Sequence, residues 1–268
     1  MNIFKRTLSI VLLFCLLVFP LVNTASAVDA SCGDSLTWSY DDSTKTLTIS
    51  GSGEMTDYYN NRKVPWKSVR SEAENVVLPS GITSIGSYAF FKFEKLKEIT
   101  IPKGITKIGN GAFGGCTSLS RIVLPETVKS IEGWTFGGCT SLSYIKLPSS
   151  LTSINYECFL GCESLMDVTI PSASTSIGGY AFGYLKSHAY NYDMIIRGVP
   201  GSFAQSYAQS NKLNFISVYS SQTLTSKQAA ELTTAFTYPY SITEVDINAD
   251  GVFSSRDILV SLKGEQNN

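Results

Sequence analysis

Apolar residues recur along this chain at a strict interval of 23 residues. Five prolines share the interval, and each directly follows a triplet in which two apolar residues flank a middle residue. The prolines are Pro79, Pro102, Pro125, Pro148 and Pro171, and the triplets are Val76–Leu78, Ile99–Ile101, Ile122–Leu124, Ile145–Leu147 and Val168–Ile170. A short segment of this kind that ends at proline is typical of a β-strand whose outer residues face inward and whose middle residue faces solvent. The pattern therefore predicts one short strand per repeat.

Three further columns of apolar residues have the same period. They are Ile85, Ile108, Ile131, Ile154 and Ile177; Phe90, Phe113, Phe136, Phe159 and Phe182; and Leu96, Leu119, Leu142 and Leu165. One isoleucine, one phenylalanine and one leucine cannot bury themselves within a single repeat, but stacked repeats join them into continuous ladders. We therefore predict a repeat solenoid whose stability comes from the stacking of neighbouring coils.

The pattern changes on both sides of the repeats. Upstream, apolar residues alternate with polar ones over residues 36–40 and again over residues 47–49, around a turn at residues 41–45, which predicts a β-hairpin. Such a hairpin would cap the first coil, within residues 28–75. Downstream of Tyr219 the period is lost and Ser, Thr, Gln and Tyr dominate, which indicates a domain boundary.

The repeats resemble those of a known family. The segments 108–119 and 122–125 are similar to the repeat of BspA-like (treponemal-type) bacterial leucine-rich surface proteins. The resemblance covers residues 76–218, including a C-terminal cap over residues 195–216, and residues 32–66 resemble the N-terminal cap of that family. It implies a leucine-rich repeat fold, β-rich with short helical turns, and a non-catalytic role in binding or adhesion.

The first 27 residues have the features of a secretory signal. Lys5 and Arg6 precede an apolar run over residues 8–22, and the small residues 25–27 offer a cleavage site. No later segment approaches the roughly 20 apolar residues that a membrane-spanning helix needs. We therefore predict a protein without a membrane span, either secreted or associated with the cell surface through a scaffold. A formal net charge of −1 argues against a nucleic-acid partner.

Cysteine usage does not indicate a disulfide framework. Cys15 lies in the signal, and five cysteines remain, so at least one has no partner. Cys116, Cys139 and Cys162 share the 23-residue period, which is compatible with bonds between adjacent coils or with small buried thiols that fill the ladder. We favour the buried thiols. Cys158 and Cys162 lack the second ligand pair that a zinc site would require.

A calcium-binding loop is predicted after the repeats. Residues 246–257 match the twelve-residue EF-hand pattern, in which side-chain oxygens at loop positions 1, 3, 5 and 12 and a backbone carbonyl at position 7 surround Ca²⁺. The predicted ligands are Asp246, Asn248, Asp250, Val252 and Asp257. The alternative is a plain turn, since Asn, Asp and Gly also favour turns.

The loop also resembles one half of a type I dockerin, the module that attaches bacterial proteins to cohesin-bearing scaffolds such as the cellulosome. The resemblance implies that Ser255 and Arg256 help to select the cohesin. A dockerin has two such halves, and here the first half is degenerate. Residues 224–232 resemble its helix, but Gln228 stands where an aspartate would close the loop. We therefore predict a small, mainly helical dockerin-like module at residues 219–268 that binds one Ca²⁺.

Two candidate surfaces arise from the outward positions of the coils. The first is the predicted strand face, where Lys97 would join the predicted ligand-binding residues. Those residues are Glu98, Thr100, Arg121, Val123, Tyr144, Lys146, Asp167 and Thr169. They line up if the coils stack in register, and would contact a protein or polysaccharide ligand, although polar residues are also the default on solvated strands. The second is a column of Tyr88, Trp134 and Tyr180, which could stack on sugars but is expected to pack at the edge of the core.

The main alternative is a polysaccharide-degrading enzyme of a cellulosome. Catalytic carboxylate pairs of glycosidases lie about 5–10 Å apart. Glu98 and Asp167 are three coils apart, which is about 14 Å at strand spacing. The only histidine, His188, replaces a residue of the leucine column and is predicted to be structural. A third possibility is that the calcium loop only stabilises the C-terminus. We favour a secreted binding protein that docks through its tail.

Overall fold

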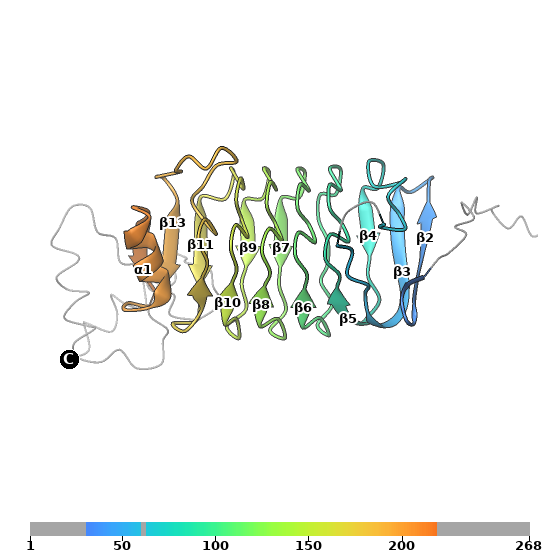
Figure 1. Ribbon diagram of the computed structural model, residues 1–268, viewed down its shortest axis with the longest axis horizontal. Helices are drawn as coiled ribbons and strands as arrows, with labels where there is room; N and C mark the ends of the chain where they lie inside the picture. Colours follow the sequence, from blue (N-terminus) through green and yellow to red (C-terminus); the bar gives the residue numbers. More distant parts are fainter. Residues whose placement is uncertain (1–30, 60–62, 219–268) are drawn as a thin grey trace, which may run out of the picture.

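The computed structural model describes residues 31–59 and 63–218, which form an elongated stack of coils (Figure 1). Nearly all of the regular structure is β, as the 23-residue period predicts. The strands are β1 (Ser31–Gly33), β2 (Leu36–Asp41), β3 (Thr46–Glu54), β4 (Asn75–Val77), β5 (Gly81–Ile85), β6 (Lys107–Ile108), β7 (Arg121–Val123), β8 (Ser130–Ile131), β9 (Tyr144–Lys146), β10 (Ser153–Ile154), β11 (Asp167–Ile170), β12 (Ser176–Ile177), β13 (Ile195–Gly198) and β14 (Asn214–Ser217). One helix, α1 (Phe203–Ser210), is present in the described ranges.

One side of the stack carries the strands predicted from the triplets. They form as β4, β7, β9 and β11, each beginning one residue earlier than predicted, and the inward and outward alternation is confirmed. Parallel pairing joins β7 to β9 and joins β11, β13 and β14 into one sheet. The prediction of a strand at Ile99–Ile101 is wrong. On this side of its coil, the chain forms an isolated β-bridge between Glu98 and Arg121 and no hydrogen-bonded strand.

A second ladder of strands lies on another side of the coils and was not predicted. It consists of β5, β6, β8, β10 and β12, paired in parallel with a constant shift of 23 residues, as in Ser130 with Ser153 and Ile131 with Ile154. Most of these strands are only two residues long, which is too short for an alternating pattern to be visible in the sequence. Each contributes one residue of the predicted isoleucine column to the core.

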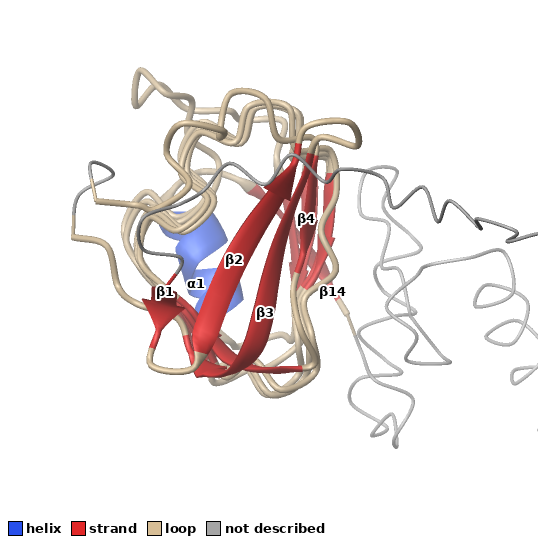
Figure 2. Ribbon diagram, turned by 90° about the vertical axis from the view of Figure 1, so that its right-hand side faces the viewer, coloured by secondary structure: helices blue, strands red, loops and turns tan. Residues whose placement is uncertain are grey.

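The N-terminal hairpin joins both ladders. β2 and β3 pair antiparallel, as predicted, and β3 is long enough to pair with β4 at one end and with β5 at the other. Gly51, near the middle of β3, has φ +105°, and a Cβ there would lie 2.0 Å from the carbonyl oxygen of Ser35. Only glycine fits this bend. Seen along the stack, β2 and β3 cover the first coil (Figure 2).

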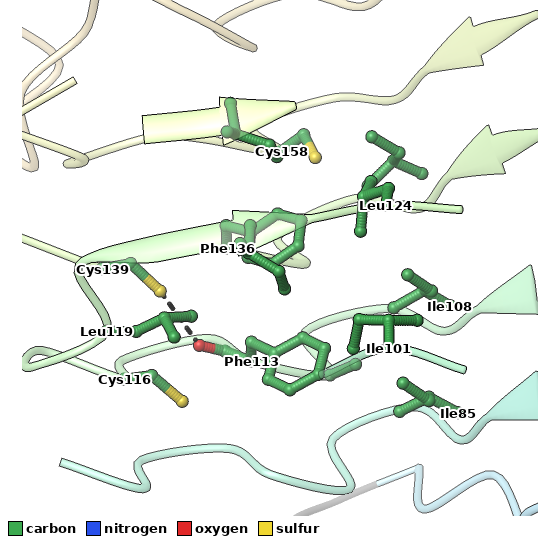
Figure 3. Close-up of a cluster of buried hydrophobic side chains, with 14 of the residues drawn as sticks. Ile85, Ile101, Ile108, Phe113, Cys116, Leu119, Leu124, Phe136, Cys139 and Cys158 are labelled. Carbon is green, nitrogen blue, oxygen red and sulfur yellow. Dashed lines mark hydrogen bonds between the residues drawn. The ribbon is translucent and has the colours of Figure 1, made fainter. Parts of the chain in front are cut away.

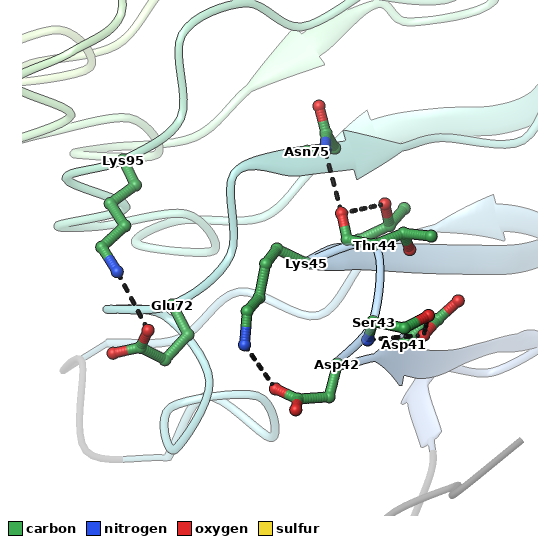
Figure 4. A network of polar contacts seen from close by, with 9 residues as sticks. Asp41, Asp42, Ser43, Thr44, Lys45, Glu72, Asn75 and Lys95 are labelled. Atoms are coloured by element: carbon green, nitrogen blue, oxygen red, sulfur yellow. Dashed lines mark hydrogen bonds and ion pairs between the residues drawn. The ribbon is translucent and has the colours of Figure 1, made fainter.

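Polar contacts fasten the hairpin turn to the first coil (Figure 4). The Asp41 carboxylate accepts from the backbone N–H of Ser43 at 2.9 Å, and Lys45 Nζ lies 2.7 Å from Asp42 Oδ1. The side-chain amide of Asn75, in β4, donates to the carbonyl oxygen of Thr44. The turn therefore fixes the hairpin in position over β4.

The core is a stack of aromatic rings (Figure 3). The rings of Phe113 and Phe136 lie 5.6 Å apart and nearly parallel, and those of Phe136 and Phe159 lie 5.2 Å apart. All five phenylalanines of the column are buried, together with the predicted leucine column and four of the five isoleucines; Ile177, in the last coil, is only half-buried. Because each ring packs on the same ring of the next coil, the stack has no natural end and requires a cap at both sides.

Aromatic side chains cap this stack at both ends. Within it, each phenylalanine N–H donates to a carbonyl of the next coil, as Phe136 does to Cys158 at 2.9 Å. At the last coil the Tyr207 hydroxyl, from α1, accepts from the N–H of Phe182 and donates to its carbonyl, both at 2.8 Å. At the first coil Trp66 Nε1 donates to the carbonyl of Ala89. Each cap thus supplies the hydrogen-bonding group that a further coil would provide.

All five described cysteines are buried free thiols. This confirms the interpretation that the cysteine column consists of small buried side chains of the core. Cys116, Cys139 and Cys162 each donate to the carbonyl of a phenylalanine in the preceding coil, at 3.1–3.2 Å. Figure 3 shows the bond from Cys139 to Phe113. Burial raises the pKa of the Cys116 thiol well above its usual value. The Cys116 thiol therefore stays protonated, and the three cysteines of this column act as core side chains.

Several predictions fall on residues 1–30 and 219–268, which lie outside the described residues. They are the secretory signal, the degenerate first half of the tail, the calcium ligands and the two cohesin-selecting residues. In the described ranges, no helix has the length and apolar character required to cross a membrane.

Candidate binding surfaces

The predicted strand face forms one side of the stack. Pairing aligns Arg121 with Tyr144 and Val123 with Lys146, so their side chains form two outward rows across β7 and β9. Most of the eight predicted residues are exposed, while Tyr144, Asp167 and Thr169 are half-buried. Val77 and Val123, both exposed, add apolar patches to the same side.

Neighbouring side chains hold two of these residues in place. The Arg121 guanidinium lies 4.4 Å from the centre of the Tyr144 ring, a cation–π contact. Asp167 accepts two hydrogen bonds of 2.8 Å from Arg197 Nε, and Arg197 Nη2 lies 2.7 Å from its Oδ2. Arg197 lies in β13, in the segment that resembles the C-terminal cap, and was not predicted as part of this face. The carboxylate of Asp167 is thus largely neutralised.

The part of the strand face formed by β7 and β9 is consequently basic. Arg121 and Lys146 project from adjacent strands, and exposed Lys97 lies in the preceding coil. Glu98 pairs with Arg121 through an isolated β-bridge. It is the acidic residue nearest to these three basic residues in the alignment of the strands. This centre suits an acidic surface.

A second surface, the tyrosine cluster, was missed by the sequence analysis. It consists of Tyr156, Tyr180, Tyr184, Tyr190 and Tyr192, at the end of the stack next to β13 and α1. The rings form an unbroken chain of contacts with centroid distances of 4.8–5.6 Å. Of these five tyrosines, only Tyr180 lies in a column of aromatic residues with the 23-residue period. The feature of the sequence that could have indicated the cluster is the high density of tyrosine over residues 180–192.

The two other aromatic residues of the predicted column behave differently from Tyr180. Tyr88 and Trp134 are half-buried, and each ring covers a glycine, Gly111 and Gly137 respectively, where a Cβ would approach within 2.8 Å. Their expected packing at the edge of the core is confirmed. Tyr180 is exposed, and its ring contacts those of Tyr156, Tyr184 and His188.

A partly buried network of hydrogen bonds supports the cluster. The Glu157 carboxylate accepts from Trp134 Nε1 and from the Tyr156 hydroxyl, and its Oε1 lies 3.2 Å from His188 Nε2. Burial alone would raise the pKa of Glu157, but these hydrogen bonds outweigh it and lower the pKa. The carboxylate is therefore ionised at neutral pH and fixes Tyr156, Trp134 and His188 relative to one another.

The prediction that His188 occupies the leucine column needs a correction. The side chain of His188 is 48% exposed and its backbone has φ +60°. Its ring packs against Tyr180 at 5.4 Å instead of entering the core. The cause is the segment over residues 184–194, where the period fails and the chain leaves the path of the earlier coils. Nearby, a cavity of about 10 Å³ lies between Phe182 and Met194, with room for no more than one water molecule.

The described residues hold no group of three or more His, Cys, Asp or Glu side chains that could bind a metal ion. The predicted calcium ligands are all in the undescribed tail. The two acidic residues of the outward column, Glu98 and Asp167, are not brought together either, because the coils that carry Arg121 and Tyr144 lie between them.

Comparison with known proteins agrees with the repeat pattern. Residues 69–188 match six copies of the family described as BspA type Leucine rich repeat region. No curated protein matches the chain.

Solved structures of leucine-rich repeat proteins are also similar to this chain. They include the Treponema pallidum protein TpLRR, with 21% identity and a TM-score of 0.42 over 71% of this chain and 86% of that protein. A Bacteroides ovatus leucine-rich repeat protein has 20% identity and a TM-score of 0.44, over 72% of this chain and 59% of that one. A leucine rich cell surface protein of Faecalibacterium prausnitzii has 21% identity and a TM-score of 0.41, over 63% and 54% of the two chains.

Proposed function

Because residues 69–188 match six copies of the BspA type leucine-rich repeat region, we propose that this chain is a non-catalytic extracellular recognition protein. Its strand face binds a protein partner, and its tail tethers it to a scaffold. The observation that carries the first part is the open, basic centre of the strand face. Arg121 and Lys146 project diagonally to one another from the paired strands β7 and β9, and Arg197 neutralises the nearby Asp167.

The face has the composition of a recognition surface. It combines an aromatic ring with a stacked guanidinium, exposed valines and positive charges. Aromatic residues and arginine are enriched where proteins bind each other, and electrostatic complementarity selects the partner. An extended, regular strand surface suits contact with another protein better than enclosure of a small substrate.

Reversal of one charge tests this role. We expect Lys146→Glu to weaken binding to an acidic extracellular protein at least tenfold, because a negative charge would then oppose the acidic partner. Binding is measured by surface plasmon resonance against a panel of purified extracellular proteins, at two salt concentrations. The matched control is Lys129→Glu, an exposed lysine next to β8 in the other ladder. Equal loss in both variants, or no binding by the parent chain, contradicts the proposal.

The tethering role rests on the calcium loop. Carboxylate, amide and carbonyl oxygens at the EF-hand spacing are the donors that Ca²⁺ prefers. Asp246, Asn248, Asp250, Val252 and Asp257 would hold the ion, and its binding would order the segment that carries Ser255 and Arg256 for contact with a cohesin. The protein would then be displayed on a cohesin-bearing scaffold of the cellulosome type.

Chelation tests the tether. We expect the full chain to bind a purified type I cohesin in Ca²⁺, and EDTA, Asp246→Ala or Asp257→Ala to weaken this binding at least tenfold. Asp193→Ala, an exposed carboxylate outside the loop, is the control. Absence of cohesin binding in Ca²⁺, together with a fall in melting temperature on chelation, would show that the loop only stabilises the C-terminus.

A further inference from the structure

The tyrosine cluster concentrates exposed apolar surface at one end of the solenoid. The described residues include nine exposed large apolar side chains, and five of them lie within residues 156–192. The four tyrosines among them are Tyr156 at 52%, Tyr180 at 39%, Tyr190 at 44% and Tyr192 at 55% exposure. A patch of this kind on a soluble protein marks a binding site more often than chance exposure does.

The loop that carries the cluster is held by hydrogen bonds. Its two sides pair through the backbone, with Leu185 donating to Ala189 at 2.9 Å and Asn191 donating to Gly183 at 2.8 Å. The buried Tyr184 lies at its centre and donates to Asn211 at 2.6 Å. The exposed rings are therefore preorganised, so a ligand would meet little cost from ordering them.

The chemistry of the cluster favours a neutral, amphipathic ligand. Its carboxylate, Glu157, already accepts from three donors and is mostly covered, so it offers little to a cation. The exposed charges beside the loop, Lys186 and Asp193, are of opposite sign. What remains accessible is the exposed part of four tyrosine side chains, each an apolar ring with a hydroxyl group.

We propose that the tyrosine cluster is a saccharide-binding site. A pyranose ring has an apolar C–H face and a rim of hydroxyl groups. The C–H groups are attracted to the negative face of an aromatic ring, and the ligand hydroxyls can hydrogen-bond to tyrosine hydroxyls. Tyr190 and Tyr192 are stacked 5.3 Å apart at an interplanar angle of 12°, so each covers one face of the other, and Tyr192, at 55% exposure, is the more open ring of the pair. Tyr156 and Tyr180, one coil apart and packed edge to face, are joined to this pair through the buried Tyr184. This site is separate from the strand face and does not depend on the function proposed for it.

The test is a titration of the full chain with four neutral hexasaccharides, built from β-1,4-linked glucose, xylose, mannose and N-acetylglucosamine. Isothermal titration calorimetry is carried out up to millimolar ligand. We expect at least one to bind, and the double variant Tyr190→Ala/Tyr192→Ala to bind it at least tenfold more weakly. Tyr59→Ala is the matched control, because Tyr59 is 91% exposed and lies at the other end of the stack. Lys146→Glu is expected to leave saccharide binding unchanged.

Two further measurements keep the test decisive. Thermal melting of the double variant shows whether it folds. Tyr156→Ala changes a tyrosine on a different coil, and it should also lower the affinity if the saccharide contacts both coils. Absence of binding to all four hexasaccharides, or equal binding by the double variant, overturns the proposal. It is also overturned if the chain dimerises through these tyrosines, or if they bind a proline-rich peptide in place of sugar.

Discussion

Replacement of Phe136 by alanine should lower the free energy of unfolding by about 3–5 kcal/mol, the range for removal of a buried aromatic ring. Phe136 is fully buried, and its ring is stacked between those of Phe113 and Phe159. Neighbouring coils are fixed by two ladders of backbone hydrogen bonds, so they cannot close the cavity by moving together. The loss should therefore lie in the upper part of the range.

Denaturant unfolding, followed by circular dichroism, measures this effect. The control is Phe203→Ala, which removes the same ring from a position that is 58% exposed and should change the stability by less than about 1 kcal/mol. A loss of similar size in both variants would mean that the phenylalanine stack is not the main source of stability. The slope of the transition also matters, because a solenoid that loses cooperativity would unfold in more than one step.

Replacement of Tyr207 by phenylalanine should cost about 2–6 kcal/mol, because it leaves two buried backbone groups of Phe182 without their partner at roughly 1–3 kcal/mol each. The ring is retained, so the change removes only the hydroxyl that accepts from the N–H and donates to the carbonyl. Burial raises the pKa of Tyr207 to about 12, so this hydroxyl is protonated and able to donate at neutral pH.

The matched control for this variant is Tyr192→Phe, which removes a hydroxyl from an exposed ring. Hydrogen exchange of the Phe182 amide gives a local readout that a general loss of packing would not produce. We expect its protection to fall more than that of Phe136, whose partner is a backbone carbonyl. Unchanged stability would mean that water replaces the hydroxyl and that α1 caps the stack by packing alone.

Much of this fold could be predicted from the sequence, because a solenoid repeats its core positions. Residues such as Phe113 and Ile131 recur at a fixed interval, and stacking in register is the arrangement that buries them all. The second ladder escaped prediction because Ser130 and Ile131 form a strand only through their neighbours in adjacent coils. The strand expected at Ile99–Ile101 illustrates the opposite error, in which a correct burial pattern did not bring a hydrogen-bonded ladder.

The binding surfaces could be predicted less completely. Outward positions such as Arg121 and Tyr144 follow directly from the register. The pairing of Asp167 with Arg197 does not, because the two residues are separated by the loop where the period fails. The tyrosine cluster depends on the same loop, since Tyr190 and Tyr192 belong to no column. Irregular segments obtain their structure from contacts that no periodic pattern records.

The two aromatic caps also bear on how such a protein can change in length. Trp66 and Tyr207 close the two ends of one ladder of backbone hydrogen bonds, Trp66 by donating to the first free carbonyl and Tyr207 by accepting from the last free N–H, so neither cap depends on how many coils lie between them. A duplication of 23 residues would present both caps with the partners they already have. Each duplication would lengthen the strand face by about 4.8 Å, the spacing of paired strands, without redesign of either end. Recognition surfaces of different reach can therefore arise by unequal recombination within one gene.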